Sequence, residues 1–365
     1  MLESYVYGIP EKGKAMRQGA VIVASGVKPY GFWSVAREIS AVLEVPLVEI
    51  SKNKLNYLHL FKDRLDFIIA VGTLSPVKIL VSSLAARRVI AYISVEGPFP
   101  ISQRLKLLIN KLKNIIVAVP SNYVRRELSF AGLKVNCIIP HGINIDKVSK
   151  ACKETKLPFH LPKDKVRVLL VLSSLQKRKL LGAAYLLKQL SRLPVEIRKE
   201  CFTIVKVPKG KSDMIRKLLS LYGIDCRDLL IIDRYLTHNE LYKLYASSDL
   251  YIHPTLSDGF GLPVLESLAS GTPVIVLDAE PWKEIATNDV GWFVHISKEV
   301  IGWEGGLPYR LKIPDLDDLA LKLRIALESI RNQRELIRRK CIERARIFDS
   351  RKVYRKFFEL MNEKV

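Results

Sequence analysis

The residues best suited to chemistry stand in the segment 253–275, which reads HPTLSDGFGLPVLESLASGTPVI. A loop with two glycines, residues 257–261, is followed by Pro263, which the first turn of a helix accepts. The amides of such a loop and the positive end of the helix favour a phosphate group. Asp258 and Glu266 flank the loop, and because carboxylates repel a diphosphate, they suit hydrogen bonds from sugar or ribose hydroxyls. The segment therefore favours a ligand site over an ordinary strand–loop–helix turn.

Two neighbouring cations lie at a second candidate position. Arg178 and Lys179 end the stretch SSLQKRK, residues 173–179, between an apolar strand-like run and a helical pattern. A guanidinium and an ammonium held at a strand end suit phosphate oxygens. The alternative is a solvated basic turn, which is common in a chain with a net charge of +22.

Short apolar runs alternate with amphipathic stretches along most of the chain, which predicts right-handed βαβ units and parallel sheets. The first series of expected strands is 20–24, 67–71, 89–93 and 115–119, with helices at about 34–44, 77–87 and 101–114. A second series begins near Val166 and continues through the runs CFTIVKV, LLIID, LYIH and TPVIVL. Two such series indicate two doubly wound α/β domains whose ligands bind beyond the carboxyl ends of the strands.

We expect four parts in the chain. They are a first domain over 1–150, a lysine-rich linker over 151–165, a second domain over 166–346 and a C-terminal helix over 347–365. Within the last part, an amphipathic helix is predicted for Ser350–Asn362, with Val353, Phe357, Leu360 and Met361 on one face.

Neither the cysteines nor the acidic residues form a metal-binding pattern. Five cysteines without paired spacing favour reduced thiols over a disulfide framework or a zinc site. The sequence Asp315-Leu316-Asp317 follows a proline and opens a helical pattern, so it is interpreted as a helix start. No metal ligands are therefore expected.

The segment 253–275 resembles glycosyltransferase family 4, whose motif places two glutamates around an EGFGLP loop. The resemblance implies that Glu266 binds the ribose of a nucleotide, while Asp258, one methylene shorter than the usual glutamate, faces the donor sugar. It further implies catalytic roles for Asp258, Glu266 and Lys179. The donor-binding residues that it implies are Arg178, Lys179, Tyr235, Leu236, Asp258, Gly259, Phe260, Gly261, Leu262 and Glu266.

The same resemblance extends to the first domain. Gly31, in the stretch SGVKPYGF over 25–32, resembles the family's glycine loop near the donor phosphates, with a simple βα turn as the alternative. The family often has a histidine after its fourth strand, where this chain has Ser94-Val95-Glu96-Gly97-Pro98. Glu96 is the candidate catalytic residue there, able to bind a sugar hydroxyl or activate the acceptor, and a plain loop carboxylate is the alternative.

The resemblance implies the GT-B fold, two Rossmann-like doubly wound parallel-sheet domains facing a cleft. It implies a retaining, metal-independent transferase that needs no cofactor and uses a nucleotide sugar, such as a UDP- or GDP-sugar. Two alternatives remain open: a GT-B sugar-nucleotide epimerase, which needs acid/base groups in the cleft, and a non-catalytic homologue that binds sugar nucleotides or nucleic acid.

The charge bears on the partners. Residues 1–165 carry 25 Lys and Arg against 12 Asp and Glu, a net +13, which attracts polyanions. The helical pattern Ile101–Asn114 sets Leu105, Leu108, Ile109 and Leu112 on one face and four cations elsewhere, Arg104, Lys106, Lys111 and Lys113. We expect a cytoplasmic protein that docks peripherally on an anionic membrane to reach a lipid-linked acceptor. The alternatives are a helix whose apolar face packs on the sheet while its cations are solvated, and an acceptor that is a glycan or a protein. Nucleic acid is the weaker alternative because no nucleic-acid-binding motif is present, and the pattern leaves the oligomeric state open.

Overall fold

The computed structural model describes residues 6–7, 19–24, 31–50, 64–72, 76–172, 174, 176–221 and 228–362. Residues 25–30 of the expected glycine loop, Ser173, Leu175 and Cys226 lie outside these residues. The chain divides into two compact units, which are Met1–Asn144 with Phe348–Val365, and Ile145–Ile347. We call them unit 1 and unit 2.

Unit 1 is built on a sheet in the order β1-β3-β2-β4-β5-β6-β7, parallel except for the edge strand β1. Its strands are β1 (Val6–Tyr7), β2 (Gly19–Ala24), β3 (Leu47–Ile50), β4 (Leu65–Gly72), β5 (Ala86–Ile93), β6 (Ile115–Val119) and β7 (Cys137–Ile138). Apolar runs such as IIVAV in β6 suit a sheet whose two faces are both covered.

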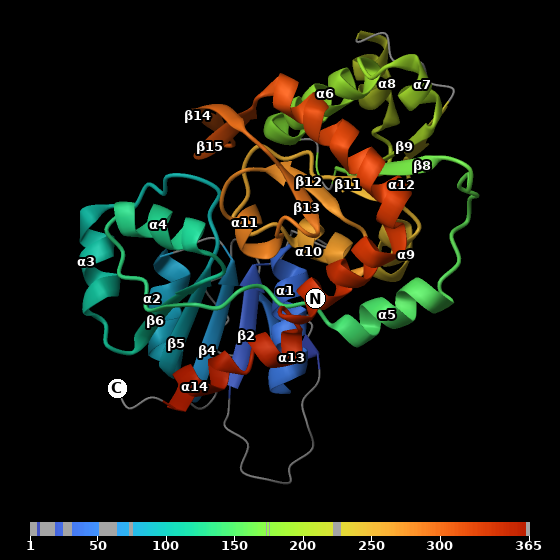
Figure 1. Ribbon diagram of the computed structural model, residues 1–365. Helices are drawn as coiled ribbons and strands as arrows, with labels where there is room; N and C mark the ends of the chain where they lie inside the picture. Colours follow the sequence, from blue (N-terminus) through green and yellow to red (C-terminus); the bar gives the residue numbers. More distant parts are fainter. Residues whose placement is uncertain are drawn as a thin grey trace. The chain divides into compact units, whose positions relative to one another are not determined.

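The helices of unit 1 pack around this sheet (Figure 1). They are α1 (Phe32–Leu43), α2 (Pro76–Ala85), α3 (Gln103–Lys111), α4 (Asn122–Phe130), α13 (Ser350–Val353) and α14 (Lys356–Asn362). The side chain of Ser121 caps α4 by accepting the Val124 N–H. The single helix predicted for Ser350–Asn362 is wrong: it is two short helices with Tyr354 between them. Tyr354 is fully buried, and its hydroxyl accepts a hydrogen bond from the Gly142 N–H at 2.9 Å.

Unit 2 is built on a sheet of six parallel strands in the order β10-β9-β8-β11-β12-β13. The strands are β8 (Val166–Val171), β9 (Cys201–Lys206), β10 (Leu229–Ile232), β11 (Leu250–Ile252), β12 (Val274–Leu277) and β13 (Gly291–Val294). The helices are α5 (Ile145–Glu154), α6 (Lys177–Ser191), α7 (Val195–Lys199), α8 (Ser212–Leu221), α9 (His238–Ala246), α10 (Leu262–Ala269), α11 (Trp282–Ile285) and α12 (Leu316–Arg346). The predicted alternation of strands and helices is thus confirmed in both units.

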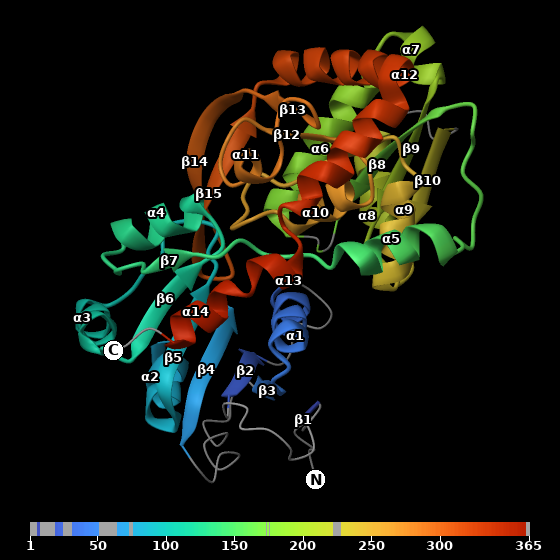
Figure 2. The same cartoon turned by 60° about the horizontal axis from the view of Figure 1, so that its bottom comes forward.

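Three features of unit 2 were not predicted. Helix α5 covers the start of the expected linker, because Ile145, Val148 and Ala151 form a buried stripe behind its lysines. The domain boundaries themselves stay predictions. Helix α12 begins at the Asp315 cap as expected but bends at Gln333, whose φ is −136° (Figure 2). An antiparallel hairpin of β14 (Ile296–Glu304) and β15 (Leu307–Pro314) stands beside the sheet (Figure 1).

Candidate functional site

In the sheet of unit 2, the order in which the chain adds strands reverses between β8 and β11. The chain runs outward from β8 to β9 and β10, then returns to pair β11 with the other edge of β8. In open parallel sheets such a switch point separates the two loops that follow the central strands and leaves a crevice for a ligand. Here those two loops are residues 172–176, which lead into α6, and residues 253–261, which lead into α10.

The loop 253–261 enters α10 as the sequence predicted. Gly261 is the residue before the helix, with φ at +107°, and Pro263 occupies the first turn. A Cβ at Gly261 would lie 3.0 Å from the Trp282 ring, so both the backbone angle and the space require glycine. Gly271, with φ at +82°, follows the end of the helix. The tight, glycine-bearing turn is therefore present.

The carboxylate of Asp258 is held from the protein side. Its Oδ1 accepts a hydrogen bond from the Phe260 N–H at 3.3 Å, and its Oδ2 lies 3.4 Å from Nε2 of His253. Burial alone would raise the pKa of Asp258, but His253, the charge of Lys179 and the Phe260 N–H together hold it below its usual value. The group is an anion, and its side chain remains 24% exposed.

Lys179 belongs to the same electrostatic group. Burial lowers the pKa of His253, and the positive charge of Lys179 lowers it further, as it also lowers that of Asp258. The structure thus brings Lys179 from α6 into the neighbourhood of Asp258, in accordance with the switch point.

Arg178 has a different environment. Its side chain is 4% exposed and donates a hydrogen bond from Nη1 to Oε2 of Glu304 in β14, at 2.8 Å. Its guanidinium carbon also lies 4.0 Å from the centroid of the Tyr309 ring in β15. Arg178 therefore faces the hairpin, and its expected contact with phosphate stays a prediction.

Glu266 lies in the middle of α10 and is half-buried. Burial raises the pKa of its carboxyl to about 8. The hydroxyls of Tyr245 and Tyr251 are buried near it, and its charge contributes to the raised pKa of each after burial itself. Glu266 is thus a half-buried carboxyl near Tyr245 and Tyr251, distinct in protonation from Asp258.

The remaining predicted residues are spread over both units. Leu236 is buried and Tyr235 is 53% exposed in the loop before α9, where Thr237 and Glu240 form a capping box. Gly259 and Leu262 flank Phe260 and Gly261 in the loop before α10. In unit 1, Gly31 precedes α1 with φ at +42°, and Glu96 follows β5 with a half-buried side chain.

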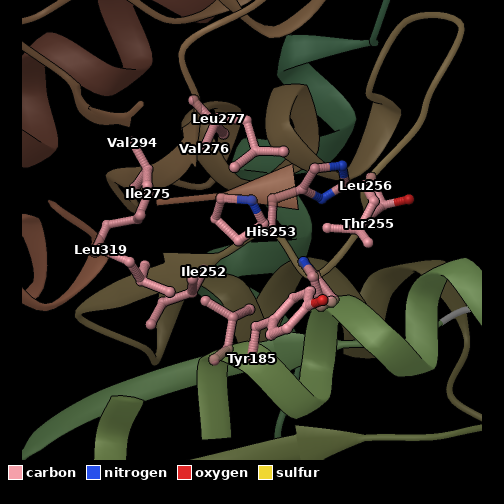
Figure 3. A pocket seen from close by; sticks show the side chains of 14 residues that line it. Tyr185, Ile252, His253, Thr255, Leu256, Ile275, Val276, Leu277, Val294 and Leu319 are labelled. Atoms are coloured by element: carbon pink, nitrogen blue, oxygen red, sulfur yellow. The ribbon is translucent and has the colours of Figure 1, made fainter. Parts of the chain in front are cut away.

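His253 was not singled out by the sequence analysis. It directly follows β11, its side chain is 5% exposed, and it also lines a small apolar pocket bounded by α6 and the ends of β11 and β12 (Figure 3). Tyr185, Leu256 and Leu277 are among the other side chains of this pocket. The only signal in the sequence was a polar residue at the end of an otherwise apolar strand.

Within the described part of the chain, no group of three His, Cys, Asp or Glu side chains is placed to hold a metal ion. Over the same residues, no helix is both long and apolar enough to cross a bilayer.

Comparison with protein families gives a match over this site. Residues 152–301 match the family model described as Glycosyl transferases group 1. This part of the chain belongs to the group 1 glycosyltransferases. The matched residues include α6, the loop 253–261 and α10, which confirms the family resemblance that the motif predicted.

Two curated relatives illustrate the similarity. The MMP alpha-(1->4)-mannosyltransferase of Mycolicibacterium hassiacum is 31% identical over 156 residues, which are 42% of this chain and 33% of that protein. The Uncharacterized glycosyltransferase 335 of Sulfolobus islandicus rod-shaped virus 1 is 26% identical over 69% of this chain and 75% of its own length. The matched region spans a third or less of the mannosyltransferases that are similar to this chain.

Solved structures agree over almost the whole chain. A glycosyltransferase from Rickettsia africae ESF-5 has a TM-score of 0.69 and 17% identity, covering 94% of this chain and 98% of its own. Anabaena Alr3699/HepE, in complex with UDP and glucose, has a TM-score of 0.68 and 16% identity, covering 94% and 99%. With the two parallel-sheet units, these similarities confirm the predicted GT-B fold.

Proposed function

We propose that the chain transfers a hexosyl group from a nucleotide sugar to an acceptor hydroxyl, with retention of the anomeric configuration. The observation that carries the proposal is the arrangement at the β8–β11 switch point, where the cation Lys179, the anion Asp258 and the largely neutral Glu266 share the ligand edge of one sheet. Group 1 family membership and the UDP-bound neighbour support the same donor class.

Each of these residues has a distinct task in the proposed reaction. The bond between the anomeric carbon and the diphosphate oxygen breaks, the acceptor oxygen bonds to that carbon, and the proton of the acceptor hydroxyl passes to the departing diphosphate. Lys179 stabilises the negative charge that grows on the departing diphosphate. Asp258 accepts hydrogen bonds from the donor sugar, and Glu266 binds the ribose. Glu96 of unit 1 binds or activates the acceptor, so Glu96→Gln lowers transfer more than it lowers donor hydrolysis.

The identity of the donor is tested by thermal stabilisation of the purified protein with a panel of UDP- and GDP-sugars. GDP-mannose has priority because relatives are named mannosyltransferases, and UDP-glucose because a structural neighbour holds UDP and glucose. The donor that stabilises is then incubated alone and with candidate acceptors. Release of the nucleoside diphosphate supports transfer, and the anomeric configuration of the product tests retention.

The same assay separates the alternatives. An epimerised nucleotide sugar formed without any acceptor would favour the epimerase. Tight donor binding without hydrolysis or transfer would favour a non-catalytic homologue. We further propose that turnover needs no divalent metal, so activity lost in EDTA and restored by magnesium or manganese would contradict that part.

The acceptor is proposed to be lipid-linked, on an anionic membrane that unit 1 contacts through α3. Support comes from two side chains of α3 that are exposed, Leu107 at 53% and Leu108 at 42%, with Arg104 and Lys111 exposed on the same helix. Of the face predicted to be apolar, only Ile109 is fully buried. Exposed leucines among cations suit an anionic bilayer surface.

Co-sedimentation with neutral and anionic vesicles at rising salt tests this contact, with duplex DNA as a competitor. Binding to anionic vesicles that fades with salt, and that a Leu107→Ser/Leu108→Ser variant loses, supports it. Leu321→Ser on α12, which is 50% exposed in unit 2, is the matched control. Tight DNA binding without vesicle binding would transfer the assignment to nucleic acid.

A further inference from the structure

Behind the loop 253–261 lies a line of three polar side chains that runs from the interior to the ligand edge. The Tyr251 hydroxyl is 2.8 Å from Nδ1 of His253, and Nε2 of the same ring is 3.4 Å from Oδ2 of Asp258. Tyr251 is fully buried, His253 is 5% exposed and Asp258 is 24% exposed. Only the last member of the line therefore reaches a ligand.

The chemistry of the three groups fixes where the protons are. An ionised carboxylate only accepts hydrogen bonds, so the His253 nitrogen that faces Asp258 carries a proton. Burial lowers the pKa of His253 and, with the charge of Lys179, outweighs the opposing effect of Asp258, so the ring is neutral at pH 7 and its Nδ1 is an acceptor. The Tyr251 hydroxyl, with its pKa raised by burial, stays protonated and donates to Nδ1.

The imidazole ring has little freedom to turn. Its centroid lies 5.8 Å from that of Trp282 in an edge-to-face arrangement and 5.7 Å from that of Tyr251. The ring also forms part of the wall of the pocket in Figure 3. A ring that is packed on several sides can hold the Asp258 carboxylate in one orientation.

Both oxygens of the Asp258 carboxylate thus have a neighbour on the protein side: Oδ2 lies within ion-pair distance of Nε2 of His253, at 3.4 Å, and Oδ1 accepts the Phe260 N–H. Each carboxylate oxygen has a second lone pair, and these are left for ligand hydroxyls. An aspartate is one methylene shorter than the glutamate of the family motif, so the orientation of its oxygens must be set by its neighbours.

We propose that His253 is a positioning residue that fixes the ionised Asp258 carboxylate in the orientation in which it accepts hydrogen bonds from the donor sugar. The proposal rests on the proposed function for the sugar-binding role of Asp258. Its geometric part, a neutral His253 with the proton on Nε2, holds independently of any reaction.

The geometric part is tested first by ¹⁵N NMR of the histidine rings in the ligand-free protein, with His253→Gln to assign the resonance. A neutral ring with the proton on Nε2 is expected at pH 7 and above, and Asp258→Asn changes its signal. A proton on Nδ1, or a charged ring at pH 7, would overturn the proposal.

Kinetics with the donor found by the thermal panel tests the role. His253→Leu removes the donor nitrogen and keeps an apolar side chain of similar reach, while His253→Gln retains an N–H that can face Asp258. We expect His253→Leu to lower kcat on the order of 10- to 100-fold, the scale of a misplaced binding group. His253→Gln restores part of this loss, and the affinity for the free nucleoside diphosphate stays near that of the wild type.

The pH profile separates positioning from a merely structural role. Without the His253 N–H, burial raises the pKa of Asp258, so the acid limb of kcat/KM in His253→Leu moves to higher pH. Asp258→Asn should lower kcat less in the His253→Leu background than in the wild type, because part of the contribution of Asp258 is already lost there. Equal activity and an unmoved acid limb in a folded His253→Leu variant would overturn the proposal. A wild type that turns over no nucleotide sugar would instead overturn the proposed function.

Discussion

At the scale of single residues, Glu266 and Asp258 form a pair of carboxyls with opposite pKa shifts. Burial raises the pKa of Glu266 to about 8, whereas His253, Lys179 and the Phe260 N–H offset burial at Asp258 and keep it ionised. A neutral carboxyl can both donate to and accept from a ribose diol, while an anion only accepts. The two positions are therefore suited to different parts of a nucleotide sugar.

This difference predicts how stability depends on pH. An unfolded glutamate has a pKa of about 4.3, so the raised folded value favours the folded state below that pH. The contribution is lost as the pH rises through about 8. Glu266→Gln does not titrate, so its melting temperature should exceed that of the wild type by several degrees at pH 8.5 and by much less at pH 5.

Glu266→Ala, which removes both the donor and the acceptor, should bind the nucleoside diphosphate more weakly by about 0.5–1.5 kcal/mol, the scale of a hydrogen bond between neutral groups. Thermal melts at the two pH values and isothermal titration measure the two effects. Glu335→Gln, at an exposed position of α12, is the control. An equal melting difference at both pH values would contradict the buried carboxyl, and unchanged affinity would contradict the ribose role.

Local sequence signals predicted Asp258, Glu266 and Lys179 at one edge because the loops that follow adjacent parallel strands share that edge. The same reasoning did not predict that Arg178 contacts the hairpin of β14 and β15. Its partner Glu304 is 126 positions later in the chain, and no residue close to Arg178 in the sequence indicates this contact. His253 was not predicted for a different reason. Its partners Tyr251 and Asp258 are close in sequence, but their contacts with the ring depend on how the loop 253–261 folds.

At the scale of elements, the hairpin β14–β15 is the feature that sequence analysis left out. Its turn, Gly305-Gly306, has positive φ at both residues and joins two strands in the way that two-residue hairpin turns do. That pair of glycines between alternating strands was a usable signal. The hairpin exposes Trp303 at 68% and Ile301 at 46%, and Arg178 contacts it from α6.

Arg178→Ala should loosen the hairpin because it removes the partner of Glu304 and the cation over the Tyr309 ring. Faster hydrogen exchange over residues 296–314 and quicker proteolysis at the glycine turn are expected. Lys179→Ala should instead weaken nucleoside diphosphate binding and leave the hairpin unchanged. Arg216→Ala on the exposed face of α8 is the control. A larger effect of Arg178→Ala than of Lys179→Ala on nucleotide binding would support the original phosphate assignment.

The turn into α10 allows a second test at this scale. Gly261→Ala introduces a Cβ at φ +107°, 3.0 Å from Trp282, and should destabilise unit 2 by about 1–3 kcal/mol. Gly210→Ala also has positive φ, +74°, but no heavy atom lies within 4 Å of its added Cβ, so a smaller loss is expected. Chemical denaturation of both variants measures the difference, and equal losses would show that the Trp282 contact contributes nothing.

At the scale of the whole molecule, the periodicity of apolar runs predicted two doubly wound sheets because buried parallel strands are continuously apolar. It did not predict α5, whose buried stripe of Ile145, Val148 and Ala151 is masked by lysines in a segment with two nearby prolines. The proposed donor residues Lys179, Asp258 and Glu266 all belong to unit 2, while Gly31 and Glu96 belong to unit 1. A ligand that binds unit 2 first should therefore slow hydrogen exchange in unit 2 only.

Hydrogen exchange with saturating UDP or GDP tests this division. We expect slower exchange over residues 176–186 and 253–271, because bound phosphates and ribose stabilise the ends of α6 and α10 against local opening. The strands β4, β5 and β6 of unit 1 should exchange as before.

The uncharged nucleoside, uridine or guanosine, lacks phosphates and should protect the α10 region without protecting α6. With a net charge of +22, the protection by the diphosphate should also weaken as salt rises, whereas that by the nucleoside should not. Protection concentrated in unit 1 would mean that the donor-binding unit has been assigned wrongly.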